Sequence, residues 1–136
     1  MVELVLIRGL PGSGKTTLAK SMTDYIHFET DMFWGEPYEF DVNRLVEAHE
    51  WCQKKVETNL NFLVDVHEDG YDSVKGVVVS NTFSTYREMQ PYFDIAWKFG
   101  IKPQIIICQG EFGSVHSVPE DVVLKMKKRF EFLQGV

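Results

Sequence analysis

The sequence contains no apolar run near the roughly 18 residues that a membrane-spanning helix needs. Its N-terminal apolar run, residues 2–7, is short and lacks a basic leader, so we expect no signal peptide. The only two cysteines are Cys52 and Cys108, which we expect to be buried free thiols in a reducing cytoplasm. Internal repeats, low-complexity tracts and linkers are absent as well. These absences favour one cytoplasmic globular domain over residues 1–136.

A surplus of positive charge is also missing. The chain has 14 basic and 20 acidic side chains, for a net charge of −6. This balance argues against extended, electrostatically driven binding to nucleic acid, although it leaves room for a small local basic site. His27 and His67 have no partners at zinc-ligand spacing, and we expect His49 to be a core or pocket-edge residue rather than a ligand.

One glycine-rich stretch carries the strongest signal. It matches the pattern Gly-x-x-x-x-Gly-Lys-Ser/Thr through Gly9, Leu10, Pro11, Gly12, Ser13, Gly14, Lys15 and Thr16. Residues 2–7 before it are typical of a buried strand, and a helix can continue from Thr17, so the setting is that of a phosphate-binding loop. Backbone N–H groups of such a loop surround the phosphates, Lys15 can bridge the β- and γ-phosphates, and the Thr16 hydroxyl can hold Mg²⁺. The sequence therefore predicts that residues 9–17 bind a nucleoside triphosphate with Mg²⁺. We take this to be ATP, because no Asn-Lys-x-Asp motif for guanine follows.

Three further apolar segments, residues 25–29, 76–80 and 105–108, are typical of strands, and helical patterns separate them. We expect the last two strands to be fully buried. Alternation of strands and helices predicts a parallel sheet flanked by helices. The predicted fold is a three-layer α/β fold with about four strands in the order 2-3-1-4. The strand that starts at residue 76 then lies beside the strand that starts at residue 2.

Capping residues locate the helices. Asp41 is expected to cap one long amphipathic helix that ends within residues 67–70. Ser84 is expected to cap a second helix that stops at Gly100, with a kink or a delayed start because of Pro91. After a loop over residues 109–118, Pro119 is expected to open a final helix. Its predicted apolar face consists of Val122, Met126, Phe130 and Leu133.

The order of these motifs resembles that of P-loop kinases. The phosphate loop, Asp31 after the second strand, and a Val-Val-Val-Ser-Asn-Thr segment at residues 77–82 follow one another as they do there. Over most of its length the chain resembles the bacteriophage polynucleotide kinase and zeta-toxin-type kinases, and residues 117–126 look like the helix that follows their lid. The resemblance implies a P-loop NTPase fold, with Lys15 in catalysis and Asp31 as the general base toward an acceptor hydroxyl. It also places Asn81 where such kinases often have an aspartate.

Simpler roles stay open for both residues. Asp31 can cap a turn after the strand, and Asn81 can be an ordinary turn residue. If Asn81 does act in catalysis, its amide can orient a hydroxyl or a metal-bound water, but it brings no charge.

Two departures from the kinase pattern concern positive charge. Residues 32–38, where the polynucleotide kinase has an arginine for the acceptor phosphate, contain no Arg or Lys. Residues 109–118, which correspond to the lid, contain no arginine, and His116 is their only candidate cation. Candidate substitutes at surface helical positions are Arg87, Lys128 and Arg129. The aromatic residues that follow Asp31, namely Phe33, Trp34, Tyr38 and Phe40, either stack on an acceptor or form a hydrophobic flap.

The favoured function is transfer of the γ-phosphate of Mg·ATP to a hydroxyl of a polynucleotide 5′ end, a nucleotide or another small molecule. The alternative is an ATP-binding interaction module whose lid has lost its catalytic arginines. An ATPase or GTPase switch is less favoured, because it needs an aspartate after the strand at residues 77–79, where the sequence has Ser80 and Asn81.

Overall fold

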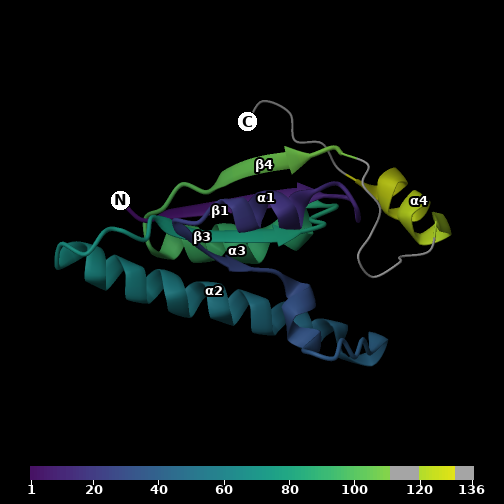
Figure 1. The fold of residues 1–136 in the computed structure, drawn as a ribbon, viewed down its shortest axis with the longest axis horizontal. Helices are drawn as coiled ribbons and strands as arrows, with labels where there is room; N and C mark the ends of the chain where they lie inside the picture. Colours follow the sequence, from purple (N-terminus) through teal and green to yellow (C-terminus); the bar gives the residue numbers. More distant parts are fainter. Residues whose placement is uncertain (111–119, 131–136) are drawn as a thin grey trace.

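The computed structural model describes residues 1–110 and 120–130. Its centre is a parallel sheet of four strands: β1 (Glu3–Gly9), β2 (Tyr25–Phe28), β3 (Gly76–Asn81) and β4 (Gln104–Cys108). The order is β2-β3-β1-β4, which confirms the predicted order 2-3-1-4 (Figure 1). In the register, Leu4 pairs with Val77 and Leu6 with Ile105. The carboxyl ends of all four strands therefore lie at one edge of the sheet.

Helices cover both faces of this sheet and make the three predicted layers (Figure 1). The α-helices are α1 (Lys15–Ser21), α2 (Leu45–Glu68), α3 (Tyr86–Lys98) and α4 (Glu120–Arg129), with short 3₁₀ helices η1 (Thr30–Trp34) and η2 (Val42–Arg44). Side chains alternate along a strand, so Leu4 and Leu6 pack with α2 and α3, whereas Val5 and Ile7 pack with Ala19 of α1. Within residues 1–110 and 120–130, no helix is both long and apolar enough to cross a membrane.

Helix α2 begins later than predicted. Asp41 does cap, but its Oδ1 accepts a 3.0 Å hydrogen bond from Asn43 N and so starts the 3₁₀ turn η2 rather than the α-helix. The C-terminus of α2 is as predicted: Gly70 has φ +92°, and Tyr71 N donates to Val66 O at 2.9 Å. A left-handed glycine closing the last turn in this way is a common helix stop.

Helix α3 is capped by Thr85, and the prediction of Ser84 was wrong. Thr85 Oγ1 accepts from Glu88 N, and Glu88 Oε2 accepts from Thr85 N, which together form a capping box. Ser84 is instead fully buried, and its carbonyl accepts from Arg8. Of the two predicted effects of Pro91, a kink or a delayed start, the delayed start is wrong, because α3 contains Pro91. Pro91 is the sixth residue of α3, so it cannot donate the hydrogen bond that the carbonyl of Arg87 would otherwise accept.

The end of the described chain differs from prediction in one respect. Strand β4 was expected to be fully buried, but it pairs only with β1 and is an edge strand, with Ile106 36% exposed. Cys52 is fully buried as expected, whereas Cys108 on β4 is half-buried; both thiols are free. Helix α4 begins at Glu120, and the predicted apolar face is half-buried at Val122, Met126 and Phe130. Leu133 and most of the expected loop, with Pro119, lie outside the described residues.

Candidate nucleotide and phosphotransfer site

The glycine-rich stretch forms a tight loop between the end of β1 and the start of α1. Gly12 and Gly14 have φ of +79° and +93°, a region that favours glycine, and α1 starts directly afterwards at Lys15. Gly9 is needed for close approach: an added Cβ would lie 2.8 Å from the carbonyl oxygen of Cys108 and closer still to Ser13 Oγ. This is the strand, turn and helix start that phosphate-binding loops require.

Lys15 is held on the inner side of this loop. Its Nζ lies 3.5 Å from Leu10 O, and the residue is partly buried. Burial lowers the pKa of Lys15, while the negative charges of Glu29 and Asp31 oppose that shift. The structure thus brings the predicted lysine into the electrostatic range of two carboxylates from the end of β2.

Glu29 contacts the predicted metal-binding hydroxyl, a contact that the sequence analysis missed. Thr16 Oγ1 and Ser80 Oγ each donate a 2.8 Å hydrogen bond to Glu29 Oε2, and His27 Nε2 lies 3.6 Å from the same oxygen. Burial alone would raise the pKa of Glu29, but the hydrogen bonds from His27, Ser80 and Thr16 outweigh it and lower the pKa to about 2. An ionised carboxylate therefore lies beside the Thr16 hydroxyl.

The signal for Glu29 was its position, since a charged residue at the carboxyl end of a buried strand lies where ligands bind in open α/β sheets. Hard oxygen donors such as Thr16 Oγ1 and a carboxylate suit Mg²⁺. Within the described residues no group of three or more His, Cys, Asp or Glu side chains could cage a metal. Mg²⁺ is usually bound through one or two protein oxygens plus substrate phosphates.

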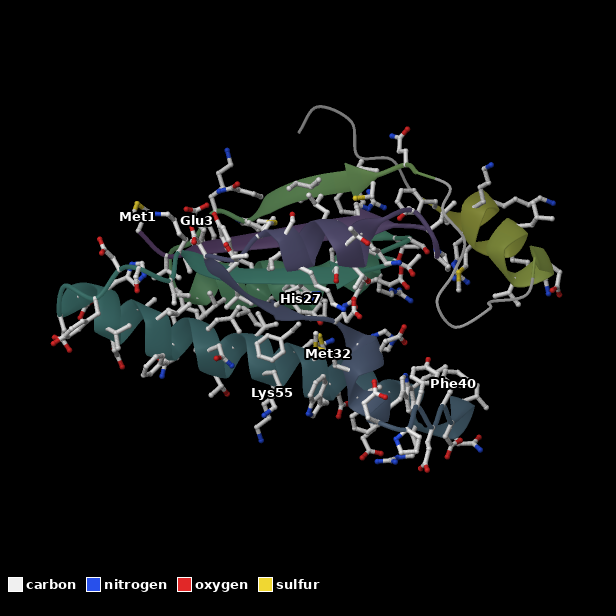
Figure 2. All side chains as sticks on the ribbon, viewed as in Figure 1. Met1, Glu3, His27, Met32, Phe40 and Lys55 are labelled. Carbon is white, nitrogen blue, oxygen red and sulfur yellow. The ribbon has the colours of Figure 1, made fainter. Side chains whose placement is uncertain are left out.

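Asp31 lies in η1, just beyond the end of β2, and is exposed. Tyr38 Oη donates to Asp31 Oδ1 at 3.2 Å. Figure 2 labels Met32 of η1 and His27 of β2. An exposed carboxylate at this edge of the sheet is free to meet an incoming acceptor.

Asn81 holds the backbone in front of Asp31. Its Oδ1 accepts a 2.9 Å hydrogen bond from Thr30 N, so the amide links the end of β3 to the residue that precedes Asp31. His49 Nδ1 lies 3.5 Å from Thr30 Oγ1, and His49 is exposed at the edge of this region rather than in the core.

The aromatic residues after Asp31 pack mainly on one another. Trp34 is 6% exposed, with ring centroids 5.1 Å from Phe33 and 5.0 Å from Phe40, whereas Phe40 itself is half exposed. The Arg44 guanidinium lies 4.8 Å from the Phe33 ring centroid. This packing favours the flap over the stacking platform. It also brings Arg44 of η2, which is ion-paired with Glu47, to a segment whose own residues 32–38 have no cation.

The candidate cations of the lid region are only partly described. His116 lies outside the described residues, and Arg87, Lys128 and Arg129 are exposed. Arg8, in contrast, is completely buried: its Nε and Nη2 donate to Phe83 O at 3.0 and 2.7 Å, and its guanidinium stacks 4.2 Å from the Phe130 ring centroid. Arg8 thereby connects β1, the start of α3 and the end of α4.

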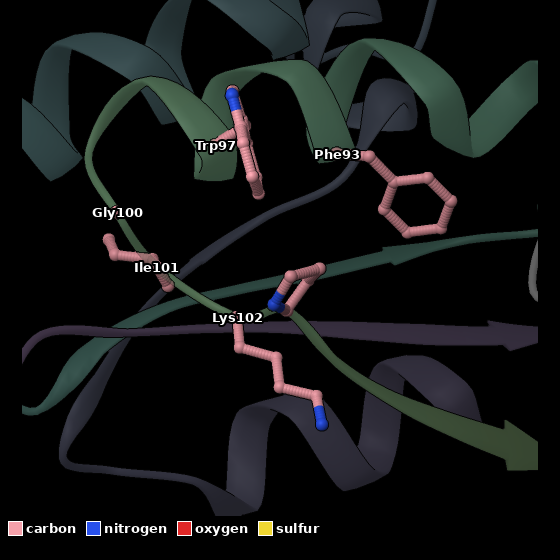
Figure 3. Close-up of a pocket in the computed structure, with 6 residues that line it drawn as sticks. Phe93, Trp97, Gly100, Ile101 and Lys102 are labelled. Carbon is pink, nitrogen blue, oxygen red and sulfur yellow. The ribbon is translucent and has the colours of Figure 1, made fainter.

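A surface hollow lies away from this site. Its volume is about 450 Å³, and Phe93, Trp97, Ile101 and Pro103 are among its lining residues (Figure 3). Pro103 directly precedes β4, so the hollow is at the amino edge of the parallel sheet, whereas the phosphate loop is at the carboxyl edge. Neither hollow nor loop contributes residues to the other.

Fold and loop together define a P-loop kinase-like domain. Residues 4–111 match the AAA domain family (AAA_33), and the chain belongs to that family. It is 29% identical over 149 residues to NEDD4-binding protein 2 of Homo sapiens, an alignment that covers 94% of this chain and 8% of the human protein.

Two solved structures share the fold. A gluconokinase from Sinorhizobium meliloti 1021 is 13% identical with a TM-score of 0.62, over 98% of this chain and 77% of that one. A chain of the Pnkp1/Rnl/Hen1 RNA repair complex is 16% identical with a TM-score of 0.60, over 98% of this chain and 40% of that one. At such low identity these likenesses concern the fold alone.

Proposed function

We propose that this domain is an ATP-dependent, Mg²⁺-requiring kinase that phosphorylates a hydroxyl group. One observation carries the proposal: the loop with Lys15 and Thr16 lies at the same sheet edge as the exposed carboxylate of Asp31. A phosphate-binding loop holds the donor, and an exposed carboxylate nearby can serve the acceptor. Membership of a P-loop kinase-like family supports the same reading.

In the proposed reaction, loop N–H groups and Lys15 bind the β- and γ-phosphates of ATP. The acceptor oxygen forms a bond to the γ-phosphorus as the bond from that phosphorus to the β–γ bridging oxygen breaks, and ADP leaves. Asp31 takes the proton of the acceptor hydroxyl. Thr16 would hold Mg²⁺, which would supply neutralisation of charge on the phosphate oxygens.

The acceptor class is the hydroxyl of a polynucleotide 5′ end, a nucleotide or another small molecule. A net charge of −6 weakens the case for a long nucleic acid, because it offers little attraction to many phosphates. Arg44 beside Phe33 is paired with Glu47 at 2.8 Å, so it would serve an acceptor phosphate at the flap only by exchanging that carboxylate for the phosphate.

An ATP-binding module without transfer activity is the second candidate. It is favoured by the sequence of residues 109–118, which has no arginine to stabilise charge on the transferring group. It predicts nucleotide binding without turnover, coupled to a conformational change or to binding of a partner.

The deciding experiment measures transfer of labelled γ-phosphate from Mg·ATP to a panel of 5′-hydroxyl DNA and RNA oligonucleotides, nucleosides, nucleotides and sugars. Labelling of one acceptor that is lost in Asp31→Asn would support the kinase and name its acceptor class. ATP binding without labelling of any acceptor would instead favour the binding module.

A further inference from the structure

The end of β3 lacks the acid that P-loop proteins commonly place near Mg²⁺. Ser80 and Asn81 occupy that position, and both are uncharged. Asn81 is further committed to Thr30 N, 2.9 Å from its Oδ1. The strand beside the phosphate loop therefore offers no carboxylate to a divalent cation.

The neighbouring strand end supplies one. Glu29 follows β2, yet its Oε2 lies 2.8 Å from Thr16 Oγ1 and 2.8 Å from Ser80 Oγ. Its side chain is 18% exposed, and its charge is aimed at the first turn of α1 rather than at solvent. The Glu29 carboxylate therefore reaches from the end of β2, across the end of β3, to the Thr16 hydroxyl, which is expected to hold the cation.

We propose that Glu29 is the acidic protein group for Mg²⁺ in this domain, in place of the acid missing from the end of β3. This inference rests on the proposed function, since it requires that the loop binds a nucleotide with Mg²⁺. Ser80 and His27 then have a positioning role: His27 Nε2 is 2.7 Å from Ser80 Oγ, and Ser80 donates to Glu29, so the carboxylate is held in one place.

The charge of Glu29 has opposite consequences with and without the metal. Beside metal-free ATP, an enclosed carboxylate repels the triphosphate, because both are negative. When Mg²⁺ lies between them, the carboxylate and the triphosphate are both attracted to the cation. Glu29 should therefore increase the factor by which Mg²⁺ tightens ATP binding, a coupling that is the same whichever ligand is added first.

A simpler alternative gives Glu29 a structural role only. As a hydrogen-bond acceptor it ties α1 to β3 through Thr16 and Ser80, and a neutral amide could do the same. The two readings differ in whether the charge matters. Glu29→Gln keeps the size and an acceptor oxygen but removes the charge, and Glu68→Gln, an exposed position at the far end of α2, is the matched control.

The experiment measures the Kd of a fluorescent ATP analogue for the full chain, once with excess Mg²⁺ and once with EDTA. We expect Glu29→Gln to bind the metal-free nucleotide several-fold more tightly than wild type and to lose at least tenfold of the Mg²⁺ enhancement. Glu68→Gln should match wild type in both conditions. An unchanged ratio of the two Kd values in Glu29→Gln would overturn the proposal.

Glu29→Asp keeps the test decisive if the glutamine variant does not fold. Aspartate keeps the negative charge, but its side chain is shorter by one methylene. It therefore weakens the hydrogen bonds to Thr16 and Ser80 and still offers the metal a carboxylate. We expect it to melt at a lower temperature and still show most of the Mg²⁺ enhancement; loss of that enhancement would count against Glu29. A wild-type domain that binds no nucleotide in either condition would overturn the proposed function as well, whereas normal binding with an unchanged ratio would overturn this inference alone.

Discussion

The two halves of the candidate site are built in different ways. The nucleotide half is one contiguous stretch, in which Gly12 and Gly14 shape the backbone and α1 starts at once. The acceptor half is assembled from η1, η2, α2 and the end of β3, and it depends on side-chain contacts such as Asn81 with Thr30 N and Tyr38 with Asp31. A loop whose shape is set by its own backbone tolerates substitutions at many surrounding positions. A site made of dispersed side chains can change its acceptor while the donor stays the same.

The largest expected effect comes from a substitution in the nucleotide half of the site. Lys15→Ala removes the ammonium that pairs with the β- and γ-phosphates, and we expect ATP affinity to fall by roughly 100-fold or more, given about 1.5–3 kcal/mol per charged hydrogen bond. Calorimetric titration with Mg·ATP measures this. Lys20→Ala, an exposed lysine in the last turn of α1, should bind like wild type. Equal affinity of Lys15→Ala and wild type would remove the loop from the site.

Asp31→Asn tests the acceptor half with the nucleotide half intact. We expect ATP affinity within about twofold of wild type and phosphate transfer slower by roughly 10²–10⁴-fold, the usual contribution of a general base. Steady-state kinetics on the labelled acceptor measure the rate. Asp72→Asn, at an exposed turn, is the matched control. Retained transfer in Asp31→Asn would mean that another group accepts the proton.

Asn81, which is partly buried, sharpens the comparison because it joins β3 to the acceptor half. Asn81→Ala leaves Thr30 N without its partner, which should cost about 1 kcal/mol of stability and let Asp31 shift. Since misplacement of a reacting group by about 1 Å can cost 10²-fold, we expect kcat to fall about tenfold with an unchanged KM for ATP.

Asn81→Asp is the conservative rescue. A carboxylate oxygen can accept the same bond from Thr30 N, so kcat should return to within about threefold of wild type. A stability loss in Asn81→Ala with unchanged kcat would reduce Asn81 to a turn residue. Failure of the aspartate variant to recover would mean that the amide has a different role.

What the sequence predicts follows the same division. The phosphate loop, the four strands and the order 2-3-1-4 could be predicted because each depends on contiguous patterns and general topological rules. Contacts made through the tertiary fold could not. Glu29 meets Thr16 only because β2 and β1 both flank β3, and nothing local marks Glu29 as a partner of that hydroxyl.

Other details could not be predicted because the local sequence was compatible with more than one arrangement. Ser84 and Thr85 are both good helix caps, and Thr85 takes the position because Glu88 lies three residues further on, whereas Ser84 is drawn into the interior beside Arg8. The apolar sequence of β4 is typical of a central strand, but the sheet ends there, so one side is uncovered. Hydrophobicity predicts a strand and does not say how many neighbours it has.

The smallest expected effect concerns the core beneath the acceptor half. Tyr92 of α3 is 2% exposed and packs edge-on against Phe83, with centroids 5.4 Å apart. Burial, and secondarily the neighbouring Cys52, raise the pKa of Tyr92 well above its usual value near 10.

Below pH 10 the Tyr92 phenol keeps its proton in both the folded and the unfolded chain, so its contribution to stability is fully present. As the pH rises above 10, the unfolded chain releases this proton and the folded chain does not, which favours unfolding. The free energy of unfolding should fall by about 1.4 kcal/mol at pH 11 from this residue alone. Tyr92→Phe should remove that part of the loss, as measured by urea unfolding of both proteins at pH 8, 10 and 11. Tyr25 and Tyr38, whose pKa values are raised to about 12, act in the same direction but cancel between the two proteins. Parallel pH profiles for wild type and Tyr92→Phe would show that Tyr92 ionises as freely in the folded protein as in the unfolded chain, and that the core beneath the acceptor half is open to water.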